Sequence, residues 1–370
     1  MKDESTATKQ RNINIDLIKC IAAISVISVH FFWNTGYYTE PMLGKRMLFM
    51  TFMRTSFMVC VPLFLIITGY LMCGKKLSAK YFYGIVHTII MYIIISLFCI
   101  LYRHIMGQEV SLKDGIKGIL DYTAAPYAWY VEMYIGLFVM IPFLNILYHN
   151  LENKKAKKLL IFILVCMIVV PTIFNIDGSK FVPAYWTGIW PILYYFIGCY
   201  IREYKPKIPL KLNIFLIFVI LIFSTFFNYK KYFGGCFEFT SYNDWYGWQN
   251  FASTVLVFLF LNNINLLHIP SVVNKVLSYI AKLSLGIYLA SWIADDWYYS
   301  RLLTKTPVMI FRLDYFPVSI GFVFLLSLLL ASVGDAIQTF IMNFWRKFHL
   351  NKNKVTVQRL AGHEKTDGVD

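Results

Sequence analysis

Three ionisable side chains occupy one face of the first long apolar stretch, IDLIKCIAAISVISVHFFW at residues 15–33. A helix turns by about 100° per residue, so Lys19 and His30 are three turns and roughly 20° apart. Asp16 falls within roughly 40° of the same stripe. A neutral imidazole accepts a proton near pH 7. The spacing therefore predicts a helix face with two charged groups at one end and a possible general base about 16 Å away from Lys19.

Charged side chains inside an apolar span are costly and normally face the interior of a helix bundle or a water-filled cavity. Each residue also has a structural interpretation. Lys19 can extend to the headgroups, Asp16 can cap the helix or pair with Lys19, and His30 can sit at the outer interface. The shared stripe favours a functional role, because separate structural roles do not require all three residues to lie on one face.

Later apolar stretches carry further polar side chains. Arg54, at the start of RTSFMVCVPLFLIITGYLM, either reaches phosphate headgroups or acts as a fixed cation for a carboxylate or a developing oxyanion. Glu132, in APYAWYVEMYIGLFVMIPFLN, is either paired with a cation such as Arg54 or is a catalytic acid or base. The stretch KLSLGIYLAS places Lys282, Ser284 and Tyr288 in otherwise apolar surroundings.

The elements that must position these side chains are membrane-spanning helices. Of the 370 residues, 58% are hydrophobic and only 15% are charged, whereas soluble domains have roughly 25% charged residues. The apolar runs are continuous and do not alternate as barrel strands do. We therefore expect an all-α polytopic membrane helix bundle with about ten transmembrane helices. The expected spans are 15–33, 52–73, 81–102, 127–148, 158–175, 185–201, 212–228, 250–267, 276–294 and 317–345.

The distribution of basic residues predicts the topology. With the N-terminus in the cytoplasm, the inner segments hold 21 Lys and Arg residues and the outer segments hold 11, so both termini are expected in the cytoplasm. This bias also accounts for the net charge of +15 without a nucleic-acid partner. We expect a cytoplasmic segment at 1–14, a membrane domain at 15–345 and a disordered basic tail at 346–370.

Cysteine and aromatic residues narrow the class further. Seven cysteines without a CxxC pair make disulfides and a metal site unexpected. The absence of a cleaved signal peptide and the short loops fit a bacterial plasma membrane. Two expected outer loops, 229–250 and 294–315, are rich in aromatic and polar residues. Such loops belong either to the interfacial aromatic belt or to a surface for carbohydrate.

Together these segments resemble the acyltransferase-3 family of integral membrane O-acyltransferases, over about residues 11–345. RNINIDLIKCIAAISVISVH resembles the family's opening, in which ten positions separate a basic residue from a histidine; Lys19 and His30 fill these places, after Asp16. VPLFLIITGYLM, AWYVEMYIGLFVMIPFLN and LSLGIYLAS resemble three further family segments in the same order. Two positions depart from the pattern: Thr68 replaces a usual serine, and Ser291 replaces a frequent second histidine.

The resemblance implies a donor and an acceptor. Family members are taken to move an acyl group, most often acetyl, from cytoplasmic acyl-CoA to a hydroxyl of an extracytoplasmic glycan. Acetyl-CoA is therefore the expected donor, and a cell-surface polysaccharide, first of all capsular, or a lipid-linked glycan is the expected acceptor. The basic cluster usual after the second span is thin here. The candidate donor-binding residues are Asp16, Lys19, Arg11, Lys75, Lys76 and Lys80.

The same resemblance suggests a mechanism in which His30 acts as general base on the acceptor hydroxyl, which then attacks the thioester. Arg54, or a hydroxyl such as that of Tyr288, would stabilise the oxyanion. An acyl-imidazole intermediate on His30 is the covalent alternative, and the sequence does not choose between the two routes. The candidate catalytic residues are His30, Arg54, Glu132 and Tyr288.

Two other functions are compatible with the sequence. A transporter or flippase for a sugar or small polar solute would also have many spans, proline breaks and buried charges, although no internal repeat is visible. A membrane sensor or partner-binding protein would use the outer aromatic loops and would not need His30.

Overall fold

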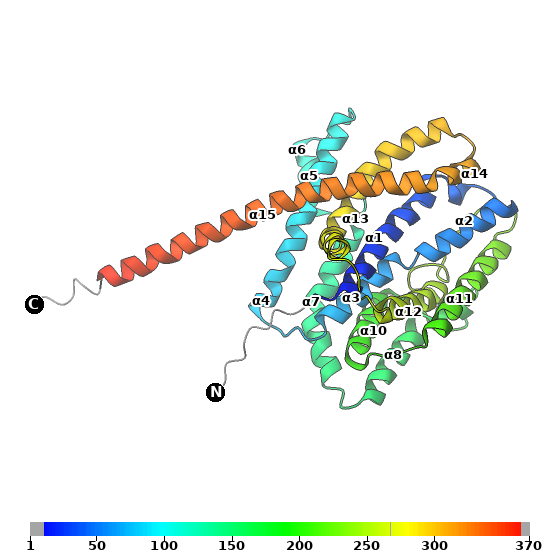
Figure 1. Cartoon of the computed structure of the whole chain (residues 1–370), viewed down its shortest axis with the longest axis horizontal. Coiled ribbons are helices and arrows are strands. Elements are labelled where there is room, and N and C mark those ends of the chain that lie inside the picture. Colours follow the sequence, from blue (N-terminus) through cyan, green and yellow to red (C-terminus); the bar gives the residue numbers. More distant parts are fainter. Residues whose placement is uncertain (1–10, 267, 364–370) are drawn as a thin grey trace, which may run out of the picture.

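The computed structural model describes residues 11–266 and 268–363, with side chains as far as residue 346. The described chain consists of helices and loops and forms no β-strand (Figure 1). Its α-helices are α1 (Ile13–Asn34), α2 (Gly44–Phe57), α3 (Cys60–Met72), α4 (Ala79–Phe82), α5 (Val86–Ile105), α6 (Leu112–Leu120), α7 (Trp129–His149), α8 (Lys154–Ile168), α9 (Val170–Phe174), α10 (Trp190–Tyr204), α11 (Leu210–Lys231), α12 (Trp248–Asn263), α13 (Ser271–Lys305), α14 (Met309–Arg312) and α15 (Phe316–His363).

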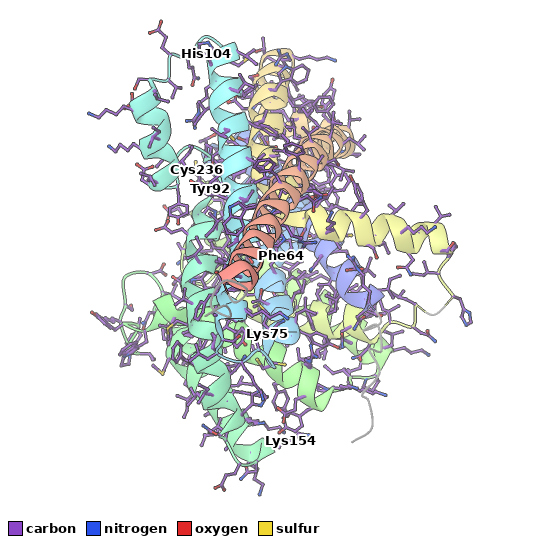
Figure 2. All side chains as sticks on the ribbon, turned by 90° about the vertical axis from the view of Figure 1, so that its left-hand side faces the viewer. Phe64, Lys75, Tyr92, His104, Lys154 and Cys236 are labelled. Carbon is purple, nitrogen blue, oxygen red and sulfur yellow. The ribbon has the colours of Figure 1, made fainter. Side chains whose placement is uncertain are left out.

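Eight helical stretches in the described part of the chain are long and apolar enough to cross a membrane. They coincide with eight of the expected spans. The other two expected spans correspond to α10 and α12, which have 15 and 16 residues. In the side view of Figure 2, His104 lies near one end of the molecule and Lys154 near the other. The prediction of an all-α polytopic helix bundle is confirmed.

The helix with the three-residue stripe lies inside the bundle. α1 contacts α2, α3, α12, α13 and α15, and Figure 1 shows it running between these neighbours. Ser25 and Ser28, on α1, are buried together with the apolar residues around them. α1 is therefore an interior helix, which is the setting in which intramembrane charged groups are tolerated.

Two glycines allow α3 and α10 to cross with their backbones in contact. A Cβ atom on Gly69 would lie 1.9 Å from the carbonyl oxygen of Tyr195, and one on Gly198 would lie 2.1 Å from that of Ile66. Small residues at such crossings let membrane helices approach closely. The contact fixes the C-terminal end of α10, and with it Arg202, beside α3.

Gly198→Ala is therefore expected to destabilise the protein by about 1–3 kcal/mol, because the added methyl group would push two backbones apart. The measurement is the thermal unfolding midpoint in detergent, which should fall by several degrees. Gly136→Ala is the matched control, because a Cβ at Gly136 of α7 meets nothing within 4 Å. Equal midpoints for the two variants would contradict this account of the α3–α10 crossing.

α13 is longer than the sequence analysis predicted. The expected span ended at residue 294, with an outer loop from there to 315, but the helix continues to Lys305. No glycine or proline occurs between Ala294 and Pro307, so nothing in this segment breaks the helix. Asp295, Tyr299 and Leu302 are buried. The extension turns a predicted loop acid into an interior one.

The C-terminal segment also differs from the expectation of a disordered tail. α15 continues through residue 346 to His363, and no proline lies in this stretch. Figure 1 shows the end of α15 projecting beyond the other helices. Residues 1–10 and 364–370, parts of the expected terminal segments, lie outside the described residues.

Candidate active site

A strongly basic cavity opens at the N-terminal end of α1. Its volume is about 730 Å³. We call it the basic cavity. Its excess of positive charge suits an anionic ligand. The charged side chains that line it are Arg11, Asp16, Lys19, Arg202, Lys205 and Lys282.

Asp16 ties the chain before α1 to α13. Its carboxylate lies 2.5 Å from Nε of Arg11 and accepts a hydrogen bond from Oγ of Ser278 at 2.8 Å. Arg11 also donates to the carbonyl oxygen of Ser278 at 2.7 Å. Asp16 is only 4% exposed, so its satisfied carboxylate shapes the wall of the basic cavity and leaves Lys19 as an unpaired cation of α1 there.

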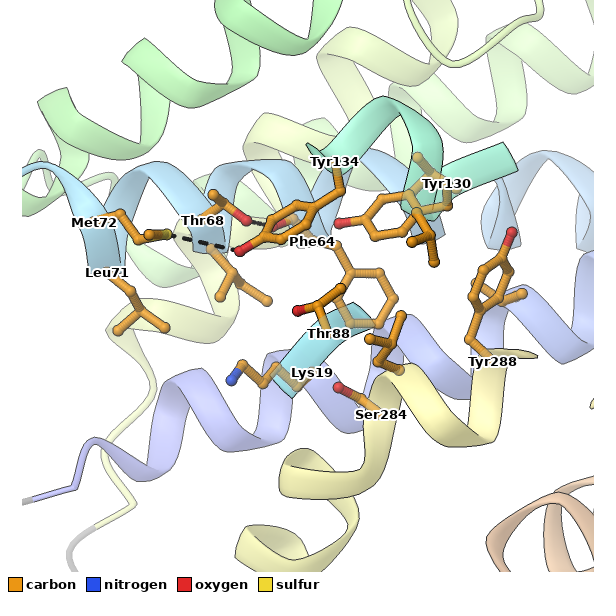
Figure 3. Close-up of a pocket in the computed structure, with 15 residues that line it drawn as sticks. Lys19, Phe64, Thr68, Leu71, Met72, Thr88, Tyr130, Tyr134, Ser284 and Tyr288 are labelled. Atoms are coloured by element: carbon orange, nitrogen blue, oxygen red, sulfur yellow. Dashed lines mark hydrogen bonds between the residues drawn. The ribbon is translucent and has the colours of Figure 1, made fainter. Parts of the chain in front are cut away.

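A second, smaller cavity adjoins the basic cavity through Lys19 and Leu71, which line both. This central cavity has a volume of about 210 Å³ and is mainly apolar, with hydroxyl groups from Thr68, Thr88 and Ser284. Figure 3 shows Lys19 and Tyr288 on opposite sides of it. The central cavity therefore leads from the cationic end of the α1 stripe toward its other end.

A third cavity contains His30. This outer cavity has a volume of about 590 Å³ and shares Val26, Val61 and Tyr288 with the central cavity. Two of its aromatic side chains, Trp129 and Trp245, are stacked with ring centroids 4.5 Å apart. Besides His30 and Tyr288, its aromatic lining residues are Trp33, Tyr38, Tyr127, Trp129, Phe239, Trp245 and Trp292.

His30 faces a buried carboxylate that the sequence analysis did not select. Nδ1 of His30 lies 3.3 Å from Oδ2 of Asp295, which is on α13 and only 1% exposed. A carboxylate accepts hydrogen bonds and does not donate them, so a hydrogen bond across this contact requires the proton of a neutral imidazole to be on Nδ1. Nε2 is then the basic nitrogen, on the side of the ring away from Asp295.

Tyr127 completes this group of side chains. Its hydroxyl donates to Oδ2 of Asp295 at 2.9 Å, and its ring centroid lies 3.9 Å from that of His30. Burial, and then the Asp295 carboxylate, raise the pKa of Tyr127 well above its usual value. The hydroxyl therefore stays protonated as a donor to Asp295. Nδ2 of Asn34 donates to the carbonyl oxygen of His30 at 2.9 Å, which helps to fix this end of α1.

The structure brings together only some of the predicted site residues. His30 and Tyr288 both line the outer cavity, and Arg11, Asp16 and Lys19 line the basic cavity. The hydroxyl of Tyr288 donates to the carbonyl oxygen of Tyr127 at 2.5 Å. This bond would have to break before Tyr288 could donate to an oxyanion.

Arg54 is fully buried next to the outer cavity but does not line it. Its guanidinium carbon lies 4.7 and 5.1 Å from the ring centroids of Phe237 and Phe239. Nε donates to the hydroxyl of Tyr38 at 3.2 Å, and Nη1 donates to the carbonyl oxygen of Asn243 at 3.3 Å. Arg54 thus holds the loop between α11 and α12 against α2, and only its partners Tyr38 and Phe239 reach the cavity wall.

The remaining predicted residues lie away from the three cavities. Glu132 is exposed near the start of α7 and lines none of them. The lysines after α3 are likewise exposed and outside the basic cavity: Lys75, Lys76 and Lys80. The basic cavity is lined instead by Arg202 and Lys205, from the C-terminal end of α10, and by Lys282 of α13, which pairs with Asp335 at 2.6 Å.

Two further residues escaped the sequence analysis for identifiable reasons. Asp295 was assigned to a loop because the expected span ended at residue 294, whereas α13 continues to Lys305. Its spacing of seven residues from Tyr288, two turns of a continued helix, was the signal that could have placed both on one face. Tyr127 carried no such signal, because its position depends on the loop before α7.

The described chain is a multi-pass helix bundle with an internal histidine–aspartate contact and a basic cavity that leads toward it. A membrane protein with these features is equipped for acid–base chemistry. The family model described as an acyltransferase domain matches residues 12–332, and the chain therefore belongs to the acyltransferase-3 family. The family resemblance seen in the sequence is confirmed, and the protein is a membrane acyltransferase. No curated protein and no solved structure gives a match to this chain.

Proposed function

We propose that the protein is a bacterial plasma-membrane O-acetyltransferase with both termini in the cytoplasm. It takes an acetyl group from acetyl-CoA, or another acyl-CoA, and transfers it to a hydroxyl of a cell-surface glycan, first of all a capsular polysaccharide. One observation carries the proposal: the basic, central and outer cavities adjoin in sequence, from Lys19 to His30. This arrangement supports a donor at one end of the passage and an acceptor at the other.

The three cavities suit the parts of the proposed donor. The phosphates of the CoA moiety would bind in the basic cavity, where the cationic side chains outnumber the single carboxylate. The narrow pantetheine arm would lie in the central cavity, whose hydroxyl groups suit its amides. The arm spans the distance from Lys19 to His30, which is about 16 Å along α1.

The acceptor would enter the outer cavity. Its aromatic walls, including the stacked pair Trp129 and Trp245, suit the apolar faces of sugar rings. The exposed indole of Trp33 also lines this cavity. These features support a glycan acceptor over a small ion or an apolar substrate.

His30 would act as the general base in a direct transfer of the acyl group. Nε2 takes the proton of the acceptor hydroxyl as its oxygen attacks the thioester carbonyl. The C–O bond forms, the C–S bond breaks, and the leaving thiolate takes the proton back from the imidazolium. The products are the ester and free CoA. Asp295, beside Nδ1, stabilises the imidazolium that exists between the two proton transfers.

The test is transfer of radiolabelled acetyl from acetyl-CoA to the producing cell's own glycans, in membrane vesicles that contain or lack the protein. The expected result is label in the glycan fraction only when the protein is present, and its release by mild alkali as an ester. A solute transporter, which the three adjoining cavities would also suit, predicts no labelled ester. Unlabelled glycans with folded protein would therefore refute the proposed function.

Lys205, in the basic cavity, gives a prediction about donor binding. Lys205→Asn is expected to raise the KM for acetyl-CoA about tenfold with little change in kcat, because one charge-assisted contact to a phosphate would be lost. Asparagine tolerates the left-handed backbone of Lys205, whose φ is 44°. The measurement is initial transfer rate against donor concentration at low salt.

Lys75→Asn is the matched control, because Lys75 is exposed and outside the basic cavity. Its KM should stay within about twofold of the wild-type value. A larger effect from Lys75 than from Lys205 would show that the donor phosphates bind at the loop after α3.

A further inference from the structure

Three side chains stand between the central and the outer cavity. Val26 of α1, Val61 of α3 and Tyr288 of α13 line both cavities. They are 3%, 3% and 5% exposed. The acyl group is the leading end of an acyl-CoA that enters from the basic cavity. It must therefore pass these three residues before its thioester can reach His30.

The constriction formed by Val26, Val61 and Tyr288 is held by packing and by a hydrogen bond. The Tyr288 hydroxyl donates to the carbonyl oxygen of Tyr127 at 2.5 Å. The Tyr288 ring packs edge-on against Tyr130, with centroids 5.9 Å apart. Valine side chains in helices have one strongly preferred rotamer. Rotation of the Tyr288 side chain out of the opening therefore requires its hydrogen bond to Tyr127 to break.

The constriction also presents an apolar surface to an acyl group that passes through it. The two valines present methyl groups, and the hydroxyl proton of Tyr288 is already used by Tyr127. An anionic carboxylate would meet no free donor among these three side chains. Moving an unpaired charge through such surroundings is strongly unfavourable.

We propose that this constriction makes the enzyme selective for neutral, unbranched acyl groups. A linear acyl chain has a cross-section similar to that of the unbranched cysteamine end of the pantetheine arm that follows it, so it passes wherever that end of the arm passes. A branched acyl group is wider than this cysteamine end, and a carboxylate-bearing group such as succinyl is charged. The inference rests on the proposed function, since it concerns which acyl-CoA can reach His30.

Three donors of equal carbon number separate width from charge: radiolabelled butyryl-CoA, its branched isomer isobutyryl-CoA, and succinyl-CoA. Membrane vesicles of the producing cell supply the full-length protein and their own glycans, and acetyl-CoA is the reference donor. Wild-type protein is expected to transfer butyryl at least about tenfold faster than isobutyryl or succinyl. Equal rates for butyryl and isobutyryl, with acetyl transfer intact, would overturn the inference.

Val61→Ala is expected to bring the isobutyryl rate to within about threefold of the butyryl rate while acetyl transfer continues. Val26→Ala, on α1, should act in the same direction and serves if the first variant does not fold. Val131→Ala and Val29→Ala are matched controls, because these residues line only the central and only the outer cavity. Their isomer ratios should match the wild-type ratio.

The outcomes keep the two proposals apart. An unchanged isomer ratio in both Val61→Ala and Val26→Ala, with acetyl still transferred, overturns the constriction as the selective element and leaves the proposed function standing. A lack of acetyl transfer by the wild-type protein overturns the proposed function, and the inference falls with it. A shifted ratio in the two constriction variants alone supports both.

Discussion

His30→Gln is expected to lower the rate of acetyl transfer by about 10²–10⁴-fold, the usual contribution of a positioned general base. Glutamine keeps much of the size and polarity of histidine but cannot accept a proton near pH 7. The imidazole lines the outer cavity beside a buried carboxylate, and no other side chain among the described residues that line this cavity is a base near pH 7. The measurement is kcat for transfer from acetyl-CoA in membrane vesicles.

The KM for acetyl-CoA should change little in His30→Gln, because the proposed phosphate contacts lie in the basic cavity at the other end of α1. Equal protein amounts and an unchanged thermal midpoint in detergent are the controls for folding. Near-normal turnover of this variant would remove His30 from the chemistry. It would then favour a role for the passage that needs no proton transfer.

The covalent route makes a separate prediction that needs no variant. If the acyl group passed through His30, incubation with acetyl-CoA in the absence of acceptor would leave an acetyl group on the histidine-containing peptide. Direct transfer, which we propose, leaves that peptide unmodified in a mass spectrum recorded under mildly alkaline conditions. Acetylated His30 that disappears on addition of glycan would replace the direct route with the covalent one.

The stripe on α1 could be predicted from sequence because its residues lie on one helix. Helical periodicity placed Lys19 and His30 on a common face, and both line the passage. The cost of charge in an apolar span then directed that face inward, as its neighbours α3, α13 and α15 confirm. Local geometry and solvation were sufficient for this part of the site.

Residues from other elements could not be placed in the same way. The cationic side chains of α10 reach the basic cavity only because Gly69 and Gly198 bring two helices into backbone contact. Sequence alone counted Arg202 as a topological charge. Conversely, Arg54 has the residue type of an oxyanion donor, but its guanidinium is held between Phe237 and Phe239 behind the cavity wall. Tertiary packing decided both cases.

Asp295→Asn is expected to reduce kcat by about 10²–10³-fold, with little change in the KM for acetyl-CoA. The amide has nearly the same shape as the carboxylate but cannot stabilise an imidazolium. It can also donate to Nδ1 of His30, which would favour the tautomer whose Nε2 carries the proton and cannot act as a base. Because Asp295 is 1% exposed, water cannot substitute for the lost charge.

The neighbouring residue provides the matched control for this substitution. Asp296 lies next to Asp295 on α13, and there it accepts a hydrogen bond from the Tyr102 hydroxyl at 2.7 Å in an exposed position. Asp296→Asn should therefore leave kcat within about twofold of the wild-type value.

Tyr127→Phe, which removes one neutral donor to Asp295, should have a smaller effect than Asp295→Asn, about threefold to tenfold. A merely structural role for Asp295 predicts instead that Asp295→Asn lowers the thermal midpoint and the amount of folded protein while the folded fraction keeps its kcat. That result would separate Asp295 from catalysis even if His30 proved essential.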